Sequence, residues 1–307
     1  MFDRIALVTK LTRLEELLSR HHSRSRVAFF LKGRGESIDE YASEHDRYQA
    51  ALRTLEGALQ RAELPIARCE RTAVSLFDFR PKDLVVVLGP DGLFVNVAKY
   101  LDGQPVLTVN PDPERIDGVL MRFAPEGVAG VLPKILKDEF AVEDITLALA
   151  TTNDGQILLA VNEFLVGRRD QGSARYRITL RGVEEERQSS SGVLISTGTG
   201  STGWMKSIMA GAVALTGGAP RYTVPFPRDT RSLLFAVREP WKSKWTGVSL
   251  THGHVREGEE LTIHSEMAEG GAISSDGVLE DAIDFNAGTS VTIQVAARAA
   301  RLITSST

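Results

Sequence analysis

The feature that most restricts the fold of this chain is the continuous apolar run Leu-Val-Val-Val-Leu at residues 84–88, which ends at Gly-Pro-Asp-Gly, residues 89–92. An apolar run without polar alternation is typical of a central parallel strand that is buried on both faces. A helical pattern follows the turn, with Leu93 and Val97 on one side. The run therefore predicts an α/β unit with a parallel sheet.

Other segments in the first half of the chain fit the same architecture. Residues 5–8 form a short apolar run, and Thr12 with Glu15 matches a capping box at the start of a helix. Residues 38–63 carry a sparse apolar stripe that is typical of an amphipathic helix. We therefore predict an α/β domain at residues 1–145, which also contains a short strand at 105–109.

After residue 145 the pattern changes to short alternating runs separated by Gly, Pro, Asp and Ser. Runs of this kind are typical of antiparallel strands. We therefore predict an all-β-rich C-terminal domain at residues 146–307, in which 203–215 is the one helical segment. The expected strands lie at 157–161, 176–180, 193–195, 233–237, 261–263 and 291–293.

Length and charge restrict the class of protein. A chain of 307 residues is long enough for two domains, and its net charge of −4 argues against a nucleic-acid partner. Cys69 is the single cysteine, which fits a reducing compartment. The sequence contains no apolar run long enough for a membrane span and no signal-peptide pattern. We therefore expect a cytoplasmic protein that binds neither nucleic acid nor membrane.

The Gly-Pro-Asp-Gly turn is the first candidate site. In an open α/β sheet, ligands bind beyond the carboxyl ends of the strands, and a turn into a helix offers N–H groups to phosphate at Gly89 and Gly92. Asp91 adds a negative charge, which suits a general base or a group that holds Mg²⁺ between phosphates. The alternative is a structural turn in which Asp91 is the helix N-cap.

A second candidate is the Gly- and hydroxyl-rich loop at residues 196–204, which lacks the lysine of a P-loop. Its glycines would let the backbone approach a ligand, and its hydroxyls would bind sugar or phosphate oxygens. A solvated turn is the alternative. The third candidate is Asn162-Glu163, which could bind an adenine amine and a ribose hydroxyl, or simply end a strand. The loop residues of interest are Thr199, Gly200, Ser201 and Thr202.

Three further groups carry weaker signals. A cluster of four arginines could neutralise phosphates or form a solvated hairpin. His252 and His254 lack metal-ligand spacing, so we predict surface histidines and no metal site. The three tryptophans are most simply core or interface residues. The arginines are Arg168, Arg169, Arg175 and Arg177, and the tryptophans are Trp204, Trp241 and Trp245.

These motifs, in this order, resemble those of the ATP-NAD kinase family. The family's Gly-Gly-Asp-Gly turn corresponds to residues 89–92, its Asn-Glu pair to Asn162-Glu163, its Thr-Gly-Ser-Thr loop to 199–202 and its late Asp-Gly segment to 275–277. The chain is most similar to the mitochondrial-type branch and its bacterial relatives, in the opening residues 8–13 and in residues 109–115, 190–192 and 233–240.

The resemblance implies an NAD kinase-like two-domain fold and transfer of a phosphoryl group from ATP, or from polyphosphate, to the 2′-hydroxyl of NAD. Asp91 would be the general base, and ATP with Mg²⁺ would lie over Gly89 and Gly92. Asn162, Glu163 and the 199–202 loop would hold the dinucleotide, with Ser207 joining them. The resemblance also implies a homodimer or homotetramer.

Pro90 departs from the family pattern, since it stands where relatives have a second glycine and it lacks a backbone N–H. Ser191 likewise replaces an aspartate of many relatives. Two alternatives therefore stay open. One is a non-catalytic NAD(P)-binding or sensing protein with a degenerate donor site, and the other is a related lipid or sugar kinase.

Overall fold

The computed structural model describes residues 2–181 and 185–304 and divides into two compact units. The first unit ends at Glu143, two residues before the predicted boundary, and the second covers Asp144–Ala300. Residues 301–304 belong to the first unit, whereas the sequence assigned all of 146–307 to the second domain. The reason is strand pairing: Arg301 and Leu302 pair in parallel with Pro105 and Val106.

The first unit is built on a parallel sheet in the order β2-β1-β3-β4-β16. The chain passes from β1 to β2 on one side of β1 and then to β3 on the other, so the winding direction reverses between β1 and β3. The predicted strands at 5–8, 84–88 and 105–109 are confirmed. The strands are β1 (Arg4–Thr9), β2 (Ile66–Glu70), β3 (Asp83–Leu88), β4 (Pro105–Val109) and the end of β16 (Ser290–Thr304).

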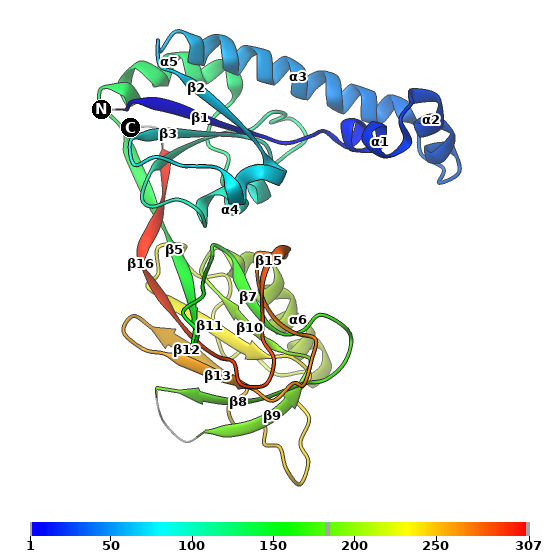
Figure 1. The fold of residues 1–307 in the computed structure, drawn as a ribbon, viewed down its shortest axis with the longest axis vertical. Coiled ribbons are helices and arrows are strands. Elements are labelled where there is room, and N and C mark those ends of the chain that lie inside the picture. Colours follow the sequence, from blue (N-terminus) through cyan, green and yellow to red (C-terminus); the bar gives the residue numbers. More distant parts are fainter. Residues whose placement is uncertain (1, 182–184, 305–307) are drawn as a thin grey trace. The chain divides into compact units, whose positions relative to one another are not determined.

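Helices cover both faces of this sheet (Figure 1). Helices α3 (Ile38–Gln60) and α5 (Pro125–Leu136) lie on one face, and α4 (Asp91–Ala98) lies on the other. The apolar stripe of α3 packs with α5 onto the inward side chains of β1, β3 and β4. This core contains Ile5, Leu7, Tyr48, Leu55, Leu59, Leu84, Val86, Leu88, Leu107, Val109, Val128, Leu132 and Ile135.

The polar segment between β1 and β2 forms three helices. Helix α1 (Arg13–His21) begins with the predicted capping box, in which Thr12 and Glu15 each bond the other's backbone N–H. Helix α2 (Arg24–Lys32) begins at the cap Ser23 and leads into α3. Figure 1 shows α1 and α2 beyond the strand ends, at the N-terminal end of α3. The segment therefore extends the first unit past the carboxyl ends of its strands. A 3-10 helix, η1 (Arg71–Leu76), follows β2.

The second unit is β-rich, as predicted. Its antiparallel six-stranded sheet has the order β12-β11-β10-β7-β14-β15, and its remaining strands pair around β13, β8 and β16. Apolar side chains of both sets form one core that includes Phe164, Tyr176, Phe235 and Ile263. The strands are β5 (Ala141–Thr152), β6 (Ile157–Ala160), β7 (Glu163–Arg168), β8 (Ala174–Leu180), β9 (Glu186–Ser190), β10 (Val193–Ser196), β11 (Ser232–Val237), β12 (His252–Arg256), β13 (Leu261–Ser265), β14 (Gly271–Ser275) and β15 (Val278–Asp284).

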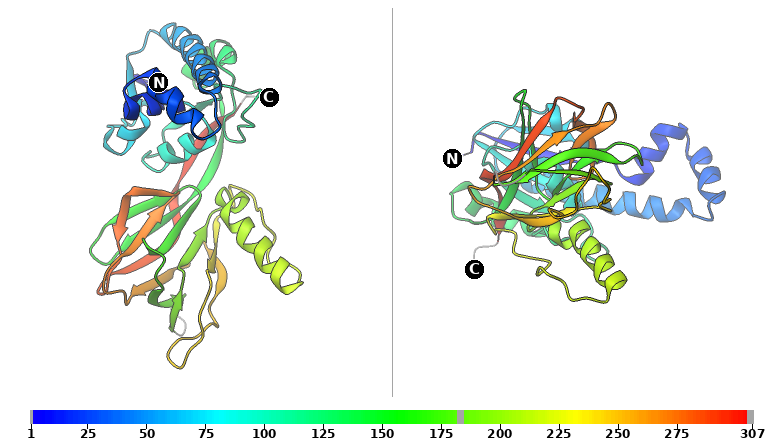
Figure 2. Two further views of the ribbon diagram at one scale, coloured as in Figure 1. Left: turned by 90° about the vertical axis from the view of Figure 1, so that its right-hand side faces the viewer. Right: turned by 90° about the horizontal axis from the view of Figure 1, so that it is seen from below.

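Helix α6 (Trp204–Thr216) is the long helix among the described residues of this unit, and Figure 2 shows it at the side of the strands. It follows the short 3-10 helix η2 (Gly200–Thr202). Trp241 and Trp245 are 70% and 77% exposed, so they are not core residues, and their alternative assignment as interface residues stays a prediction; Trp204 is 36% exposed at the start of α6. Across the described ranges, no helix is both long and apolar enough to cross a membrane.

A buried tyrosine fastens α3 to the strand ends of the first unit. The Tyr48 hydroxyl donates to the Leu88 carbonyl at 3.1 Å and accepts from the Lys10 N–H, also at 3.1 Å. Burial raises the pKa of Tyr48 to about 12, so the phenol stays protonated and keeps donating at neutral pH. The helix is thereby joined to the end of β3 and to the residue that follows β1.

We expect Tyr48→Phe to lower the free energy of unfolding of the first unit by roughly 1–3 kcal/mol, because it leaves a buried carbonyl and an N–H without their partner. Urea unfolding followed by circular dichroism measures this. Tyr41→Phe is the matched control on the same helix, and its loss should be smaller since the Tyr41 hydroxyl bonds Glu36 near the surface. Equal losses would remove the proposed role of Tyr48.

Candidate functional site

The connection between β6 and β7 is held by a carboxylate from a distant turn. Asp276 accepts hydrogen bonds from the backbone N–H groups of Val161, Asn162 and Glu163, at 3.0, 2.6 and 3.2 Å. The N–H of Asp276 donates in turn to the Glu163 carbonyl at 2.9 Å. Asp276 has a φ of 55°, in the left-handed region, and Gly277 follows it at 72°. This bond set fixes the backbone from which the Asn162 and Glu163 side chains project.

The hydroxyl-rich loop packs directly against this connection. Thr197 N–H donates to the Asn162 carbonyl at 2.9 Å, and the Thr197 hydroxyl donates to the Val161 carbonyl at 2.5 Å. The same Thr197 oxygen accepts from the Thr199 N–H at 3.1 Å. The structure therefore brings the second and third candidate motifs together in one place within the second unit.

Two glycines of the loop are required by the protein's own backbone. A Cβ on Gly200 would lie 2.2 Å from the Asn162 carbonyl oxygen and 2.8 Å from Glu163 Oε2. A Cβ on Gly198 would lie 2.1 Å from the Pro227 carbonyl oxygen. We expected these glycines to let a ligand approach, but in the structure Gly200 lets the loop approach the Asn162-Glu163 turn and Gly198 lets it approach the backbone at Pro227.

Most of the loop hydroxyls are used inside the protein. Ser201 donates to the Gly198 carbonyl at 2.6 Å, Thr202 to the Thr199 carbonyl at 3.0 Å and Ser207 to the Gly203 carbonyl at 3.3 Å. The Thr199 hydroxyl differs, because it is buried and has no hydrogen-bond partner among the residues that the structure describes. A buried hydroxyl without a partner is costly, so Thr199 is a candidate contact for a polar ligand atom.

Glu163 is an acid of this site with a strongly shifted pKa. Burial raises its pKa to about 7, and the nearby negative charge of Asp276 acts in the same direction. At neutral pH the side chain is therefore divided between a carboxylic acid, which can donate, and a carboxylate, which accepts. Perturbed acids of this kind gather at functional sites.

In the first unit, the Gly-Pro-Asp-Gly turn joins β3 to α4. Pro90 is the N-cap of α4, and Asp91 is the first residue of the helix. The Asp91 carboxylate accepts from the N–H of Val119 at 3.0 Å and from that of Leu120 at 2.9 Å. The interpretation of Asp91 as helix N-cap is therefore wrong, because its side chain turns away from its own helix to hold a neighbouring loop.

The two glycines of this turn differ in their surroundings. A Cβ on Gly89 would lie 2.7 Å from Leu93 Cδ2, so this position is restricted by packing. A Cβ on Gly92 would have open space around it. The first N–H groups of a helix have no partner within the helix, so those of Asp91 and Gly92 point outward at the start of α4. Each Asp91 oxygen also keeps a second lone pair beyond its backbone bond.

Three of the four clustered arginines form ion pairs. Arg168 pairs with Asp170 at 2.6 Å, Arg169 with Asp284 at 2.9 Å and Arg177 with Glu185 at 3.0 Å, as in a solvated hairpin. Burial lowers the pKa of His254, which contacts the Ser232 hydroxyl. In the part of the chain that the structure describes, no three His, Cys, Asp or Glu side chains gather as a metal site.

The predicted residues therefore form two groups. Asn162, Glu163 and the 199–202 loop lie together in the second unit, whereas Gly89, Asp91 and Gly92 lie in the first. Ser207 lies one turn into α6 and bonds its own helix. The sequence reasoning assigned no role to Asp276. Its signal was the Asp-Gly pair itself, since a left-handed residue followed by glycine is typical of a tight turn.

Comparison with known proteins places the architecture. No protein-family model matches the chain. An NAD kinase from Archaeoglobus fulgidus in complex with ATP superimposes with a TM-score of 0.60 at 18% identity, covering 98% of this chain and 94% of that one. Yeast NADH kinase complexed with NADH gives a TM-score of 0.59 at 15% identity, covering 99% and 84%. The fold is that of the NAD kinases.

Proteins named NAD kinase also match part of the sequence. NAD kinases of Cupriavidus pinatubonensis and Ralstonia nicotianae are each 31% identical over 146 residues, which is 46% of this chain and 45% of each relative. That of Methanothermobacter thermautotrophicus is 29% identical over 128 residues, 41% of this chain and 44% of the relative. The match spans less than half the length of each NAD kinase.

We expect Gly200→Ala to lower the free energy of unfolding by roughly 1–3 kcal/mol, because the new Cβ meets backbone that has to move. Gly211→Ala, in α6, is the matched control. Nothing lies within 4 Å of its Cβ, and alanine within a helix should stabilise it by roughly 0.5–1 kcal/mol. Thermal unfolding of both variants measures the difference. Similar midpoints would contradict the close packing of the loop.

We expect the stability of Glu163→Gln relative to the wild-type protein to be greater at pH 8 than at pH 5. The folded pKa of Glu163, about 7, lies above the value of 4.5 expected for an unfolded chain. Its contribution to stability is therefore complete below pH 4.5 and is lost as the pH rises through 7. The variant lacks this loss, so its advantage should grow by on the order of 3 kcal/mol, measured by urea unfolding at each pH. A pH-independent difference would contradict the raised pKa.

Proposed function

We propose that this chain is an NAD kinase, which transfers a phosphoryl group from ATP or polyphosphate to the 2′-hydroxyl of NAD and forms NADP. The observation that carries the proposal is the site in the second unit. There Asp276 fixes the Asn162-Glu163 turn against a loop whose buried Thr199 hydroxyl has no partner in the described residues. The NAD kinase fold and the partial matches to named NAD kinases support the same conclusion.

The second unit offers groups that suit a dinucleotide. The Asn162 amide can both donate and accept, as an adenine edge requires. Ionised Glu163 can accept from two ribose hydroxyls, and Thr199 can donate to or accept from a third polar atom. Because Ser201, Thr202 and Ser207 already donate to carbonyls, we assign them to holding the loop and to secondary contacts.

The first unit offers groups that suit phosphoryl transfer. In this reaction the ribose 2′-oxygen bonds to the γ-phosphorus, the bond to the β-phosphate oxygen breaks, and the hydroxyl proton leaves. We assign that proton to Asp91, whose carboxylate is held by the Val119 and Leu120 N–H groups. The N–H groups of Asp91 and Gly92 would bind phosphate oxygens. Mg²⁺ is usually held by phosphates and one or two carboxylates, so it would enter with ATP.

The finer assignments belong to the same proposal. Similarity in residues 8–13 and 109–115 favours the mitochondrial-type branch of the family. We also propose a homodimer or homotetramer, as the family resemblance implies.

A specific observation favours one alternative, an NAD-binding protein without kinase activity. Pro90 has no N–H and caps α4 without a side-chain hydrogen bond. A charge-assisted hydrogen bond to phosphate contributes roughly 1.5–3 kcal/mol, so losing one weakens binding of the donor tenfold or more. This alternative predicts binding of NAD or NADP with no turnover.

Incubation of the purified protein with NAD, Mg²⁺ and either ATP or polyphosphate should yield NADP, measured by an NADP-specific dehydrogenase assay. Asp91→Asn should lower turnover by at least about a hundredfold, since general-base contributions are typically of this size or larger. Binding of NAD, measured by calorimetry, should stay within a few-fold because Asp91 is outside the second unit.

The outcomes separate the candidate functions. NAD binding with no NADP from either donor would support the non-catalytic alternative. Absence of both NAD and NADP binding would contradict the NAD kinase and the non-catalytic alternative, and would favour a kinase with a different acceptor. Unchanged turnover in Asp91→Asn would remove this residue from the role of general base.

A further inference from the structure

A cavity of about 620 Å³ opens at the carboxyl ends of β1 and β3 in the first unit. Lys10, which follows β1, and Pro90, which follows β3, both line it, and Tyr48 of α3 lies between them. Ligands of open α/β sheets bind at the point where the winding direction reverses, which here lies between β1 and β3. The cavity therefore occupies the expected ligand position of this sheet and begins one residue from Asp91.

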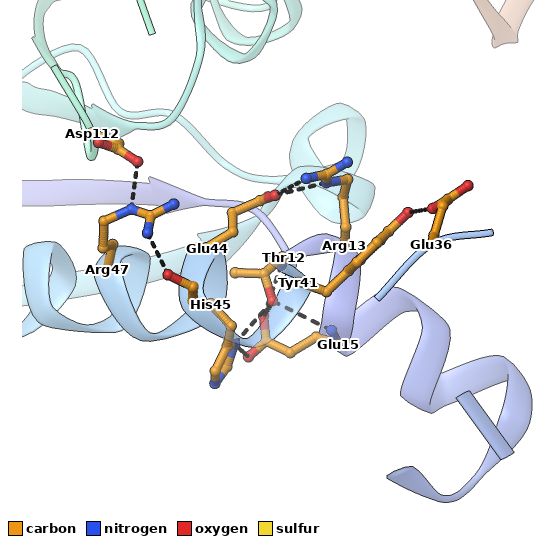
Figure 3. A network of polar contacts seen from close by, with 10 residues as sticks. Thr12, Arg13, Glu15, Glu36, Tyr41, Glu44, His45, Arg47 and Asp112 are labelled. Atoms are coloured by element: carbon orange, nitrogen blue, oxygen red, sulfur yellow. Dashed lines mark hydrogen bonds and ion pairs between the residues drawn. The ribbon is translucent and has the colours of Figure 1, made fainter. Parts of the chain in front are cut away.

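The cavity wall is rich in charge. Four cationic and three acidic side chains line it, which leaves an excess of positive charge. Two of the cations are paired: Arg13 Nε lies 2.7 Å from Glu44 Oε2, and Arg47 Nε lies 2.6 Å from Asp112 Oδ2 (Figure 3). These ion pairs, together with the bond from Arg47 to Ser43 at 2.6 Å, fix the wall in place.

The other two cations, Lys10 and Arg115, have no ion pair within residues 2–181 and 185–304. Lys10 is half-buried beside the Gly-Pro-Asp-Gly turn. Arg115 is exposed on the turn after β4, whose backbone bonds to the Asp112 carbonyl at 3.1 Å. An anion in the cavity could thus bind two cationic side chains without breaking an existing pair.

Resting on the proposed kinase function, we propose that this cavity binds the phosphate chain of the phosphoryl donor, with Lys10 and Arg115 as its main ligands. The chemistry is that of a linear polyphosphate, either the triphosphate of ATP or an inorganic chain. The volume lies within the range of about 300–1,000 Å³ that is typical of small-molecule sites. Lys and Arg are the side chains that commonly bind phosphate.

This assignment gives a function to the polar segment between β1 and β2. That segment supplies Arg13, Glu44, Arg47 and Tyr48, so its helices α1 and α3 complete a wall that the strands alone would leave open. It also explains how the turn tolerates Pro90. The N–H that proline lacks is replaced by two side-chain cations, so the donor site is altered and still functional.

The test uses the full chain and measures binding of Mg²⁺-ATP and of Mg²⁺-tripolyphosphate by calorimetry at fixed ionic strength. We expect Lys10→Gln and Arg115→Gln each to weaken both ligands about tenfold, because each removes a charge-assisted hydrogen bond. The double variant should lose about a hundredfold. With turnover, the KM for the donor should rise in each variant while the KM for NAD stays unchanged.

The matched control is Arg53→Gln, an exposed arginine of α3 that does not line the cavity. It should leave both affinities within about twofold. An equal loss in Arg53→Gln, or unchanged affinities in the double variant, would overturn the proposal. Thermal unfolding checks that each variant is folded. We expect folded variants because neither Lys10 nor Arg115 forms an ion pair in the described chain.

These measurements distinguish a failure of the phosphate site from a failure of the kinase proposal. Tripolyphosphate binding that depends on Lys10 and Arg115, without any NADP formation, would support this site and contradict the kinase. NADP formation with a donor KM that neither substitution changes would support the kinase and contradict this site. Competition between ATP and tripolyphosphate identifies the phosphate chain as the shared ligand, whereas tight ATP binding without competition would overturn the site.

Discussion

The candidate dinucleotide site depends on one carboxylate. Asp276 accepts from three consecutive N–H groups at residues 161–163, more than a hundred positions earlier in the chain. Such a turn cannot satisfy these N–H groups within itself, and unpaired buried N–H groups are costly. The same carboxylate lies near Glu163 and, after burial, is the second cause of its raised pKa. One residue therefore both positions the Asn162-Glu163 pair and adds to the effect of burial on the pKa of Glu163.

The two glycine-bearing turns use glycine for similar reasons. Gly200 and Gly198 are restricted by backbone of the second unit, and Gly89 is restricted by Leu93 of the first. In each case the small residue lets two segments of the same chain come into van der Waals contact. The ligand is then left to side chains and exposed N–H groups around the turn. This division explains why a motif can keep its glycines and still vary at a position such as Pro90, where a neighbouring cation can supply the missing interaction.

Much of the fold could be predicted from the sequence because its central elements have uniform patterns. The run at 84–88 and the Thr12 capping box are local signals, and both are confirmed. Strand β2 was missed since its apolar residues alternate with Arg68 and Glu70. The sequence could not decide between a core and an interface position for Trp241, because composition does not show which side chains stay exposed. The contacts of Gly200 and the partners of Asp276 depend on residues far away in sequence, and local patterns hold no information on them.

The parallel sheet of the first unit takes its last strand from the far end of the chain. Residues 301–302 pair with β4, while β1 to β4 come from the first 109 residues. During synthesis, strands β1 to β4 therefore emerge well before residues 301–302, and the edge of β4 stays unpaired until those residues have been made. Exposed strand edges promote aggregation. A fragment that stops before Arg301 would keep that edge unpaired, so residues 301–302 protect the first unit against misassembly.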